Sequence, residues 1–161
     1  MIYVYDCHKQ EDTESLAKSF AQISRKGDVF ALFGTLGVGK SVFSRSFVQN
    51  LTNAQEVPSP TFTLVQVYQA NSFDIYHYDL YRLKSAEEIW ELNIEEAIYE
   101  NVCLIEWPEK MGMYLPRDCF KVNISILSPT SRRFEIEVIS EEKQNRLFQA
   151  PRQPDMIYER K

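Results

Sequence analysis

The sequence predicts an α/β fold with three layers, a mixed central sheet and an antiparallel edge. An apolar run at residues 29–33 leads directly into Gly-Thr-Leu-Gly-Val-Gly-Lys-Ser at residues 34–41. These eight residues match the pattern G-x-x-x-x-G-K-[ST], which joins a buried strand to a helix. Residues 120–127 and 133–139 alternate apolar and polar side chains, as antiparallel strands do. Together these features predict a P-loop NTPase-like three-layer fold.

Length and composition predict one domain. The chain has 161 residues, of which 44% are hydrophobic, enough for a single core. We expect the P-loop domain to occupy residues 1–140. Residues 141–161 are polar and contain Pro151 and Pro154, so we expect a weakly ordered tail there.

Charge and cysteine content limit the possible partners and location. A net charge of −5 disfavours binding of DNA or RNA through the whole surface, so we expect no DNA partner and at most an indirect role for RNA. The three cysteines are far apart in the sequence and form no C-x-x-C pair, as expected for reduced thiols. The sequence shows neither a membrane-spanning run of about 20 apolar residues nor a signal core at the N-terminus. We therefore expect a cytoplasmic location and no membrane partner.

The first half of the chain divides into elements in a clear order. Apolar residues recur at helical spacing from Thr13 to Ile23, and a buried strand follows at residues 29–33. A second helix is predicted from Lys40 to about Leu51, ending before the loop Pro58-Ser59-Pro60. Residues 63–68 and 73–79 are rich in β-branched and aromatic side chains and predict an antiparallel hairpin.

The second half alternates in the same way. Ser85 and Glu88 fit a capping box at the start of a short helix that runs to Leu92. Residues 102–105 predict a second buried strand. Residues 120–127 and 133–139 are joined by Ser-Pro-Thr-Ser and predict an antiparallel pair at an edge of the sheet.

The glycine-rich loop is the main candidate binding site. Its backbone N–H groups can surround a phosphate where glycines leave no Cβ atom in the way, and the positive end of the following helix favours an anion. Lys40 is expected to reach the outer phosphates, and Ser41 is the expected Mg²⁺ ligand. The alternative is a glycine-rich turn without a ligand. The loop residues expected to contact the nucleotide are Gly34, Thr35, Leu36, Gly37, Val38, Gly39, Lys40 and Ser41.

Glu106 is the first candidate acid. It follows the apolar run of residues 102–105, and the carboxyl ends of parallel strands meet at the phosphate loop. A carboxylate there can hold Mg²⁺, orient water as a base, or do both. The alternative is a surface carboxylate at the end of a strand.

Asp79 is the second candidate acid, at the end of the predicted hairpin. Alternation puts His77, Asp79 and Tyr81 on one face of this strand, and an amphipathic strand with a solvated face would look the same. His77 is as readily explained by a structural hydrogen bond. Ser59 and Thr61, in the loop after the phosphate-binding helix, could sense the γ-phosphate or belong to a rigid turn.

Taken together, four ordered motifs resemble the bacterial TsaE (YjeE) family. They are the loop 34–41, Ser-Pro-Thr-Phe at 59–62, His-Tyr-Asp-Leu-Tyr-Arg at 77–82 and Glu-Trp-Pro-Glu at 106–109. The resemblance runs from about residue 13 to residue 139. Nucleotide binding alone does not require the second and fourth motifs, which makes the resemblance specific.

The resemblance implies an ATPase that supports the threonylcarbamoyladenosine modification of position 37 in tRNAs reading codons that begin with A. Such a protein would use ATP and Mg²⁺ and act on a TsaB–TsaD complex between turnovers, without transferring the threonylcarbamoyl group itself. It would meet tRNA only indirectly. An acidic chain without a basic stripe suits this division of labour.

The resemblance also implies roles for individual residues. Lys40, Asp79 and Glu106 would be catalytic, and Ser41 and Glu106 would hold Mg²⁺. Residues near the nucleotide would be Gln10, Thr13, Ser59, Thr61, Trp107 and Arg133. Thr35 stands where the family usually has Asp, and Ser41 where Thr is commoner, which puts a catalytic or partner-binding role of position 35 in doubt.

Two other functions share the phosphate loop. A small-molecule kinase normally closes a lid with several arginines over the donor phosphates, and this chain has only scattered ones, such as Arg82, Arg117, Arg132 and Arg133. A nucleotide-gated binding module without hydrolysis would lack a group that positions water, whereas Asp79 and Glu106 are both present.

Overall fold

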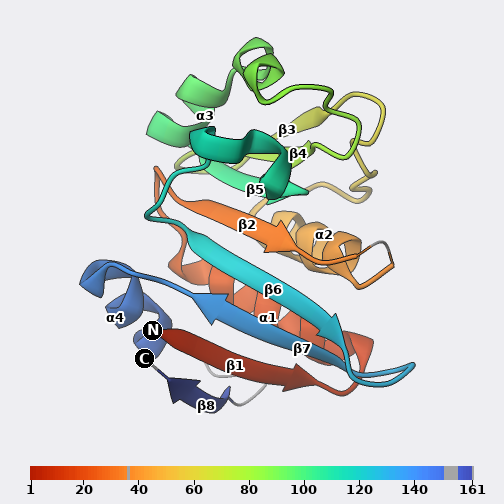
Figure 1. Cartoon of the computed structure of the whole chain (residues 1–161). Helices are drawn as coiled ribbons and strands as arrows, with labels where there is room; N and C mark the ends of the chain where they lie inside the picture. The colour runs from red at the N-terminus through yellow and green to blue at the C-terminus, as the bar shows by residue number, and fades with distance from the viewer. Residues whose placement is uncertain (36, 151–155, 161) are drawn as a thin grey trace.

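The computed structural model describes residues 1–35, 37–150 and 156–160. Within these residues the strands form one eight-stranded sheet in the order β3-β4-β5-β2-β6-β7-β1-β8 (Figure 1). The strands are β1 (Ile2–Cys7), β2 (Val29–Phe33), β3 (Val65–Gln69), β4 (Asp74–Asp79), β5 (Val102–Glu106), β6 (Phe120–Ile126), β7 (Arg132–Glu137) and β8 (Met156–Arg160).

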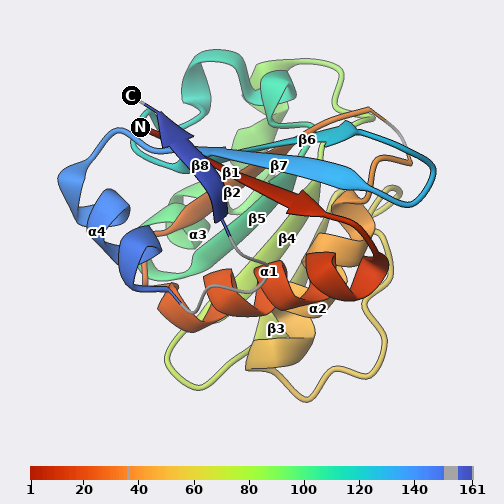
Figure 2. The ribbon, with the colours of Figure 1, turned by 90° about the horizontal axis from the view of Figure 1, so that it is seen from below.

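Helical segments cover both faces of this sheet. The α-helices are α1 (Gln10–Ile23), α2 (Lys40–Leu51), α3 (Ile94–Glu100) and α4 (Glu141–Gln149), and the 3₁₀ segments are η1 (Ala86–Leu92) and η2 (Pro108–Tyr114). Helices α1 and α2 lie together on one face (Figure 2). None of the described helices has the length and apolar character needed to cross a membrane.

The sheet is mixed, as the sequence predicts. β4, β5, β2 and β6 are parallel neighbours, and antiparallel strands flank them on both sides. Because the parallel strands point the same way, β2, β4 and β5 end at one edge of the sheet. That edge is where the phosphate loop leaves β2.

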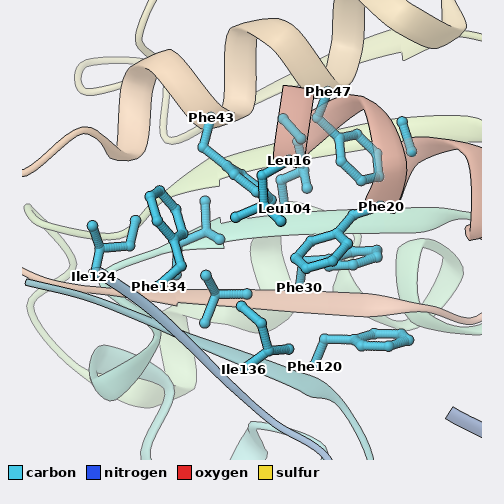
Figure 3. Packing of buried hydrophobic residues seen from close by; sticks show 14 of the residues in the cluster. Leu16, Phe20, Phe30, Phe43, Phe47, Leu104, Phe120, Ile124, Phe134 and Ile136 are labelled. Atoms are coloured by element: carbon cyan, nitrogen blue, oxygen red, sulfur yellow. The ribbon is translucent and has the colours of Figure 1, made fainter. Parts of the chain in front are cut away.

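Alternation along β2 divides the core into two. Phe30 and Leu32 face α1 and α2, whereas Val29 and Ala31 face the layer of η1, α3 and η2. On the first face aromatic rings dominate: Phe30 stacks on Phe120 with ring centroids 4.6 Å apart and meets Phe47 edge-on at 5.0 Å (Figure 3). Both faces of the sheet are therefore buried, which confirms the three layers.

Most elements predicted from the sequence are present with nearly the same bounds. α2 begins and ends where predicted, at Lys40 and Leu51. The capping box of Ser85 and Glu88 forms, although the segment that it opens is a 3₁₀ helix. α1 begins at Gln10, three residues before the predicted Thr13. The cysteines Cys7, Cys103 and Cys119 are buried and free.

The pair β6–β7 does not form an edge of the sheet, contrary to prediction. β7 pairs on its other side with β1, in which Tyr3 lies opposite Ile136, and β1 in turn pairs with β8. The N-terminal strand was not predicted because no turn and second strand follow its six residues to mark a hairpin. Its partners, β7 and β8, lie far away in the sequence. β1 and β8 therefore lie outside the pair that was predicted to form the edge.

The polar segment after Ser140 is not a weakly ordered tail over 141–149. The Ser140 hydroxyl accepts a hydrogen bond from the N–H of Lys143 and caps α4. Arg146 is buried and donates two hydrogen bonds to the carboxylate of Asp28, at 2.6 and 2.8 Å. Composition misled here because two of the charged side chains of α4, Lys143 and Arg146, are buried and form ion pairs. The prediction for 151–155 and 161 lies outside the described residues.

Candidate functional site

The phosphate loop connects the end of β2 to the start of α2. Gly39 precedes α2 with φ of 116°, a backbone conformation that side-chain-bearing residues avoid. A Cβ atom at Gly34 would lie 2.7 Å from Val38 Cγ1 and 3.0 Å from the carbonyl oxygen of Ile124. The glycines at both ends of the loop are thus required by its path. Leu36 lies outside the described residues.

Lys40 is buried and folds back against the loop. Its ammonium group donates a 2.7 Å hydrogen bond to the carbonyl oxygen of Gly34 and lies 3.9 Å from the ring centroid of Trp107. Burial lowers the pKa of Lys40, while the negative charges of Glu106, Glu109 and Asp79 act in the opposite direction. Lys40 is thus a partly desolvated cation next to the loop that is expected to hold the outer phosphates.

Asp79 and Glu106 end neighbouring parallel strands at the same level. They are paired residues in the register of β4 and β5, and both side chains are buried. Buried positions contradict both alternatives from the sequence, a surface carboxylate at residue 106 and a solvated strand face at residue 79. Two carboxylates beside the cationic end of the phosphate loop can bind a hard cation or position water.

A cavity of about 280 Å³ connects these groups. It holds both acids, Lys40 and the expected metal ligand Ser41. The lining residues are Gly37, Gly39, Lys40, Ser41, Val42, Ser59, Thr61, Asp79, Glu106 and Trp107. Eight of the residues expected from the sequence at the nucleotide or the metal therefore share one cavity: Gly37, Gly39, Lys40, Ser41, Ser59, Thr61, Glu106 and Trp107, together with the candidate acid Asp79.

The loop Pro58-Ser59-Pro60-Thr61 is tied to Asp79. Thr61 Oγ1 donates to Asp79 Oδ2 at 3.1 Å, and Ser59 Oγ donates to the same oxygen at 3.4 Å. The other carboxylate oxygen accepts from the backbone N–H of Tyr81. Asp79 thus links the end of β4 to Ser59 and Thr61, the two hydroxyls for which the sequence suggested a γ-phosphate sensor or a rigid turn.

Glu106 has a partner that sequence reasoning did not assign. His77 Nε2 lies 2.6 Å from Glu106 Oε2, and both side chains are almost fully buried. His77 stands two residues before Asp79 on β4, so its side chain lies on the same face as those of both acids. The pairing follows only once β4 and β5 are known to be neighbours, because residue 77 then falls beside the run that ends at residue 106.

Trp107 forms one wall of the cavity. Its φ of 58° is rare for a residue with a side chain and turns the chain directly after Glu106. The indole lies 5.0 Å from the ring of Tyr81, centroid to centroid. Trp107, which the resemblance implies to be near the nucleotide, thus lies in the cavity wall against Lys40.

A second cavity of about 350 Å³ lies on the other side of the loop, with Gly37, Gly39 and Val42 common to both. Gln10 and Thr13, which the resemblance implies to be near the nucleotide, line it from the first turn of α1. The remaining lining residues are Lys9, Pro129, Thr130 and Arg132. Its apolar wall and its position next to the loop suit the base and sugar of a nucleotide.

The arginine at this second cavity is Arg132, whereas the resemblance implies Arg133. Arg133 points to the other face of β7 and forms two hydrogen bonds with the carboxylate of Asp6, at 2.7 and 2.9 Å. Arg132 donates from Nε to the carbonyl oxygen of Val38 and from Nη1 to that of Ser128. A shift of one residue in a strand exchanges the two faces, which is why the expectation missed.

Three loop residues expected at the nucleotide, Gly34, Thr35 and Val38, line neither of these two cavities. Thr35 is exposed, and its carbonyl oxygen accepts a hydrogen bond from the N–H of Val38. Val38 is buried under the loop.

The donor set fits Mg²⁺ and a nucleoside triphosphate. A hydroxyl at Ser41 and carboxylates at Glu106 and Asp79 are hard oxygen ligands of the kind that Mg²⁺ prefers. Lys40 supplies a cation for phosphate, and the open space beside Gly37 and Gly39 leaves their backbone accessible. The residues present therefore match the chemistry of both groups.

Comparison with known proteins gives the same family as the motifs. Residues 7–134 match the family described as "Threonylcarbamoyl adenosine biosynthesis protein TsaE". The chain is 39% identical over 146 residues to a Rickettsia typhi protein named tRNA threonylcarbamoyladenosine biosynthesis protein TsaE, covering 90% of this chain and 98% of that one. The protein of the same name from Bacillus subtilis is 35% identical over 115 residues, covering 71% and 72%.

A solved structure shares the fold. The crystal structure of Bacillus subtilis YdiB superposes with a TM-score of 0.75 at 24% identity, covering 92% of this chain and 93% of that one. The family model, the relatives and the solved structure all match most of the chain. The chain belongs to the TsaE family.

Proposed function

We propose that the protein is a Mg-ATP-dependent ATPase of tRNA threonylcarbamoyladenosine biosynthesis in the cytoplasm. It supports the modification of position 37 in tRNAs that read codons beginning with A, by acting on a TsaB–TsaD complex so that the complex turns over repeatedly. It does not itself transfer the threonylcarbamoyl group. Family membership supports the pathway.

The observation that carries the ATPase proposal is the pairing of two buried carboxylates with a phosphate-loop lysine. Asp79 and Glu106 are register partners at the ends of β4 and β5, and both line the cavity that contains Lys40 and Ser41. One cavity thus contains a cation, a hydroxyl and two carboxylates, which are the groups that phosphoryl transfer to water requires.

Each residue has a separate task in this proposal. Ser41 and Glu106 would hold Mg²⁺, which supplies a positive charge that neutralises the phosphate oxygens. Lys40 leaves the carbonyl of Gly34 to bind a phosphate oxygen. Glu106 orients the attacking water and accepts its proton while the water oxygen bonds to the γ-phosphorus and the bond to the β-phosphate bridging oxygen breaks. Asp79 holds the hydroxyl loop beside them.

The arginines argue against the kinase alternative. Arg82 stacks on the ring of Phe62 at 4.4 Å, and Arg132 binds backbone carbonyls. Neither arginine forms a lid over the place expected for a donor phosphate. The cavity contains carboxylates that can act as a base toward water.

The first prediction concerns Glu106→Ala. Phosphate release from ATP should fall about 100-fold or more, because the general base and one metal ligand are lost together, while Mg-free nucleotide binding through Lys40 persists. The measurement is phosphate release by the protein alone and with the TsaB–TsaD complex and substrate tRNA, together with formation of the modified base. Glu95→Ala, at an exposed position on α3, is the matched control.

Two results would contradict the proposal. One is unchanged turnover of the Glu106→Ala variant, which would remove Glu106 from the reaction. The other is ATP binding without hydrolysis under every condition and without any effect on modification, which would favour the nucleotide-gated binding module.

A further inference from the structure

In the buried hydrogen bond between His77 and Glu106, the donor and the acceptor can be identified. His77 Nε2 lies 2.6 Å from Glu106 Oε2, a short distance typical of a hydrogen bond to an ionised carboxylate. The other ring nitrogen, Nδ1, is buried and has no hydrogen-bond partner in the described part of the chain. One nitrogen of the ring is thus bound to Glu106, and the other forms no hydrogen bond within the described residues.

These two facts locate the proton of the imidazole. A proton on Nδ1 would bury an unpaired N–H donor and leave the lone pair of Nε2 facing the lone pairs of Glu106 Oε2. A proton on Nε2 removes both penalties, because Nε2 then donates to the carboxylate and only an acceptor stays unpaired. The geometry therefore assigns the hydrogen to Nε2, with Glu106 as acceptor.

The bond restricts how Glu106 can point. A glutamate has three side-chain torsions and would otherwise sample several rotamers at the end of β5. With Oε2 bound to a ring that is itself held in the β4 strand, fewer positions are open to Oε1. The carboxylate is thus partly oriented before any ligand arrives.

We propose that His77 is a positioning residue that holds Glu106 ready to bind the metal ion at the phosphate loop. This inference rests on the proposed function, since it needs Glu106 at the metal. His77 does not touch the nucleotide or the cation; it acts through the carboxylate. Groups of this kind change metal affinity by about 10- to 100-fold when they are removed.

The test measures metal binding directly. Mn²⁺ replaces Mg²⁺, adenylyl imidodiphosphate replaces ATP, and electron paramagnetic resonance reports free Mn²⁺. His77→Leu fills the buried space without a donor, so Mn²⁺ affinity should fall about 10- to 100-fold while metal-free nucleotide affinity stays unchanged. His77→Gln presents an amide N–H near the place of Nε2 and should recover most of the affinity.

Two controls separate positioning from folding. Tyr76→Phe changes a buried residue of the same strand whose side chain belongs to the opposite core cluster, and it should bind Mn²⁺ as the wild type does. Thermal unfolding and metal-free nucleotide binding check that each variant is folded. Rescue by Gln is the result that a purely structural histidine would not give, because Leu fills the buried space about as well as Gln does.

The outcomes distinguish this inference from the function on which it rests. If Glu106→Ala lowers Mn²⁺ affinity and His77→Leu does not, the positioning role is wrong and the metal site stands. Equal loss in the Leu and Gln variants would also overturn it. If Glu106→Ala itself binds Mn²⁺ normally, the metal site of the proposed function is wrong, and the role of His77 falls with it.

Discussion

The side chain of Lys40 is held by the protein's own groups. The carbonyl oxygen of Gly34 accepts its hydrogen bond and the indole of Trp107 lies over it, so protein groups replace much of the solvent around the ammonium group. A phosphate oxygen has to compete with a carbonyl and a π face, both of which interact more weakly with a cation than an anion does. We therefore expect nucleotide binding to pull Nζ away from Trp107.

That movement predicts a fluorescence signal. The chain has two tryptophans, and Trp90→Phe leaves Trp107 as the sole indole. In this background Mg-ATP should change the emission of Trp107 saturably, because the cation 3.9 Å from its ring leaves. Titration by fluorescence, with affinity measured in parallel by calorimetry, is the experiment.

Lys40→Ala in the same Trp90→Phe background is the control and should show no ATP-dependent change. Saturated ATP binding in the calorimeter without any change in emission would contradict a movement of Lys40 away from the indole.

The residues of the site were predictable to different degrees. Lys40 and Ser41 follow from a contiguous pattern, because the loop geometry fixes their spacing. Glu106 and Asp79 needed the assumption that two strands end at the same edge. The pairing of His77 with Glu106 and the exchange of Arg133 for Arg132 depend on which strands are neighbours and on which face a residue lies, and one sequence does not determine either.

At the scale of elements, the loop between α2 and β3 is the part best placed to respond to nucleotide. Two hydroxyls bind Asp79, and the carbonyl oxygen of Leu64, a residue with φ of 67°, accepts from the N–H of Asp79. Next to these anchors Phe62 is 81% exposed. The loop thus joins the cavity to an exposed aromatic side chain.

This arrangement predicts ATP-dependent partner binding. Mg-ATP should order the loop and present it to the TsaB–TsaD complex, and hydrolysis should relax it. Thr61→Val keeps the shape of the side chain but loses the hydrogen bond to Asp79, so the gain in partner affinity with ATP, expected to be about tenfold, should fall close to onefold. Affinities are measured with ATP, with ADP and without nucleotide.

Thr63→Val is the matched control, because the Thr63 hydroxyl accepts from Gln66 and its bond does not involve Asp79. Equal partner affinity of the wild type in all three nucleotide states would show that the loop is not gated by ATP.

Element boundaries were predicted well where local signals are strong. α2 lies between a glycine-rich loop and a proline segment, and its bounds agree with the prediction. α3 was missed because it is only seven residues long and follows η1 after a single residue, Asn93, with φ of 57°. A single residue between two helical segments leaves no loop in the sequence that would separate them.

At the scale of the whole molecule, the C-terminal helix is part of the fold. Arg146 donates to Asp28, to the carbonyl oxygen of Ile23 and to Glu142, so it joins α4 to the end of α1 and to the start of β2. Lys143 adds an ion pair with Asp118 at 3.0 Å. These contacts reach the strand that carries the phosphate loop.

A chain that ends at Ser140 should therefore be markedly less stable. Removing α4 takes the guanidinium away from the carboxylate of Asp28, which is 2% exposed in the full chain, and breaking a buried ion pair by removing one partner costs about 3–5 kcal/mol. Urea unfolding of this chain and of Arg146→Ala should show similar losses in the free energy of unfolding. Arg25→Ala, which removes an exposed ion pair with Glu142, should cost less than about 1 kcal/mol.

A chain that ends at Ala150 separates the two C-terminal elements. It keeps α4 and its bond to Asp28 while it loses β8, which pairs only with β1 among the described strands. We expect it to retain most of the stability that the chain ending at Ser140 loses. Equal stability of the chain ending at Ser140 and the full chain would contradict an anchoring role of α4. It would favour the weakly ordered tail that composition predicts for residues 141–149.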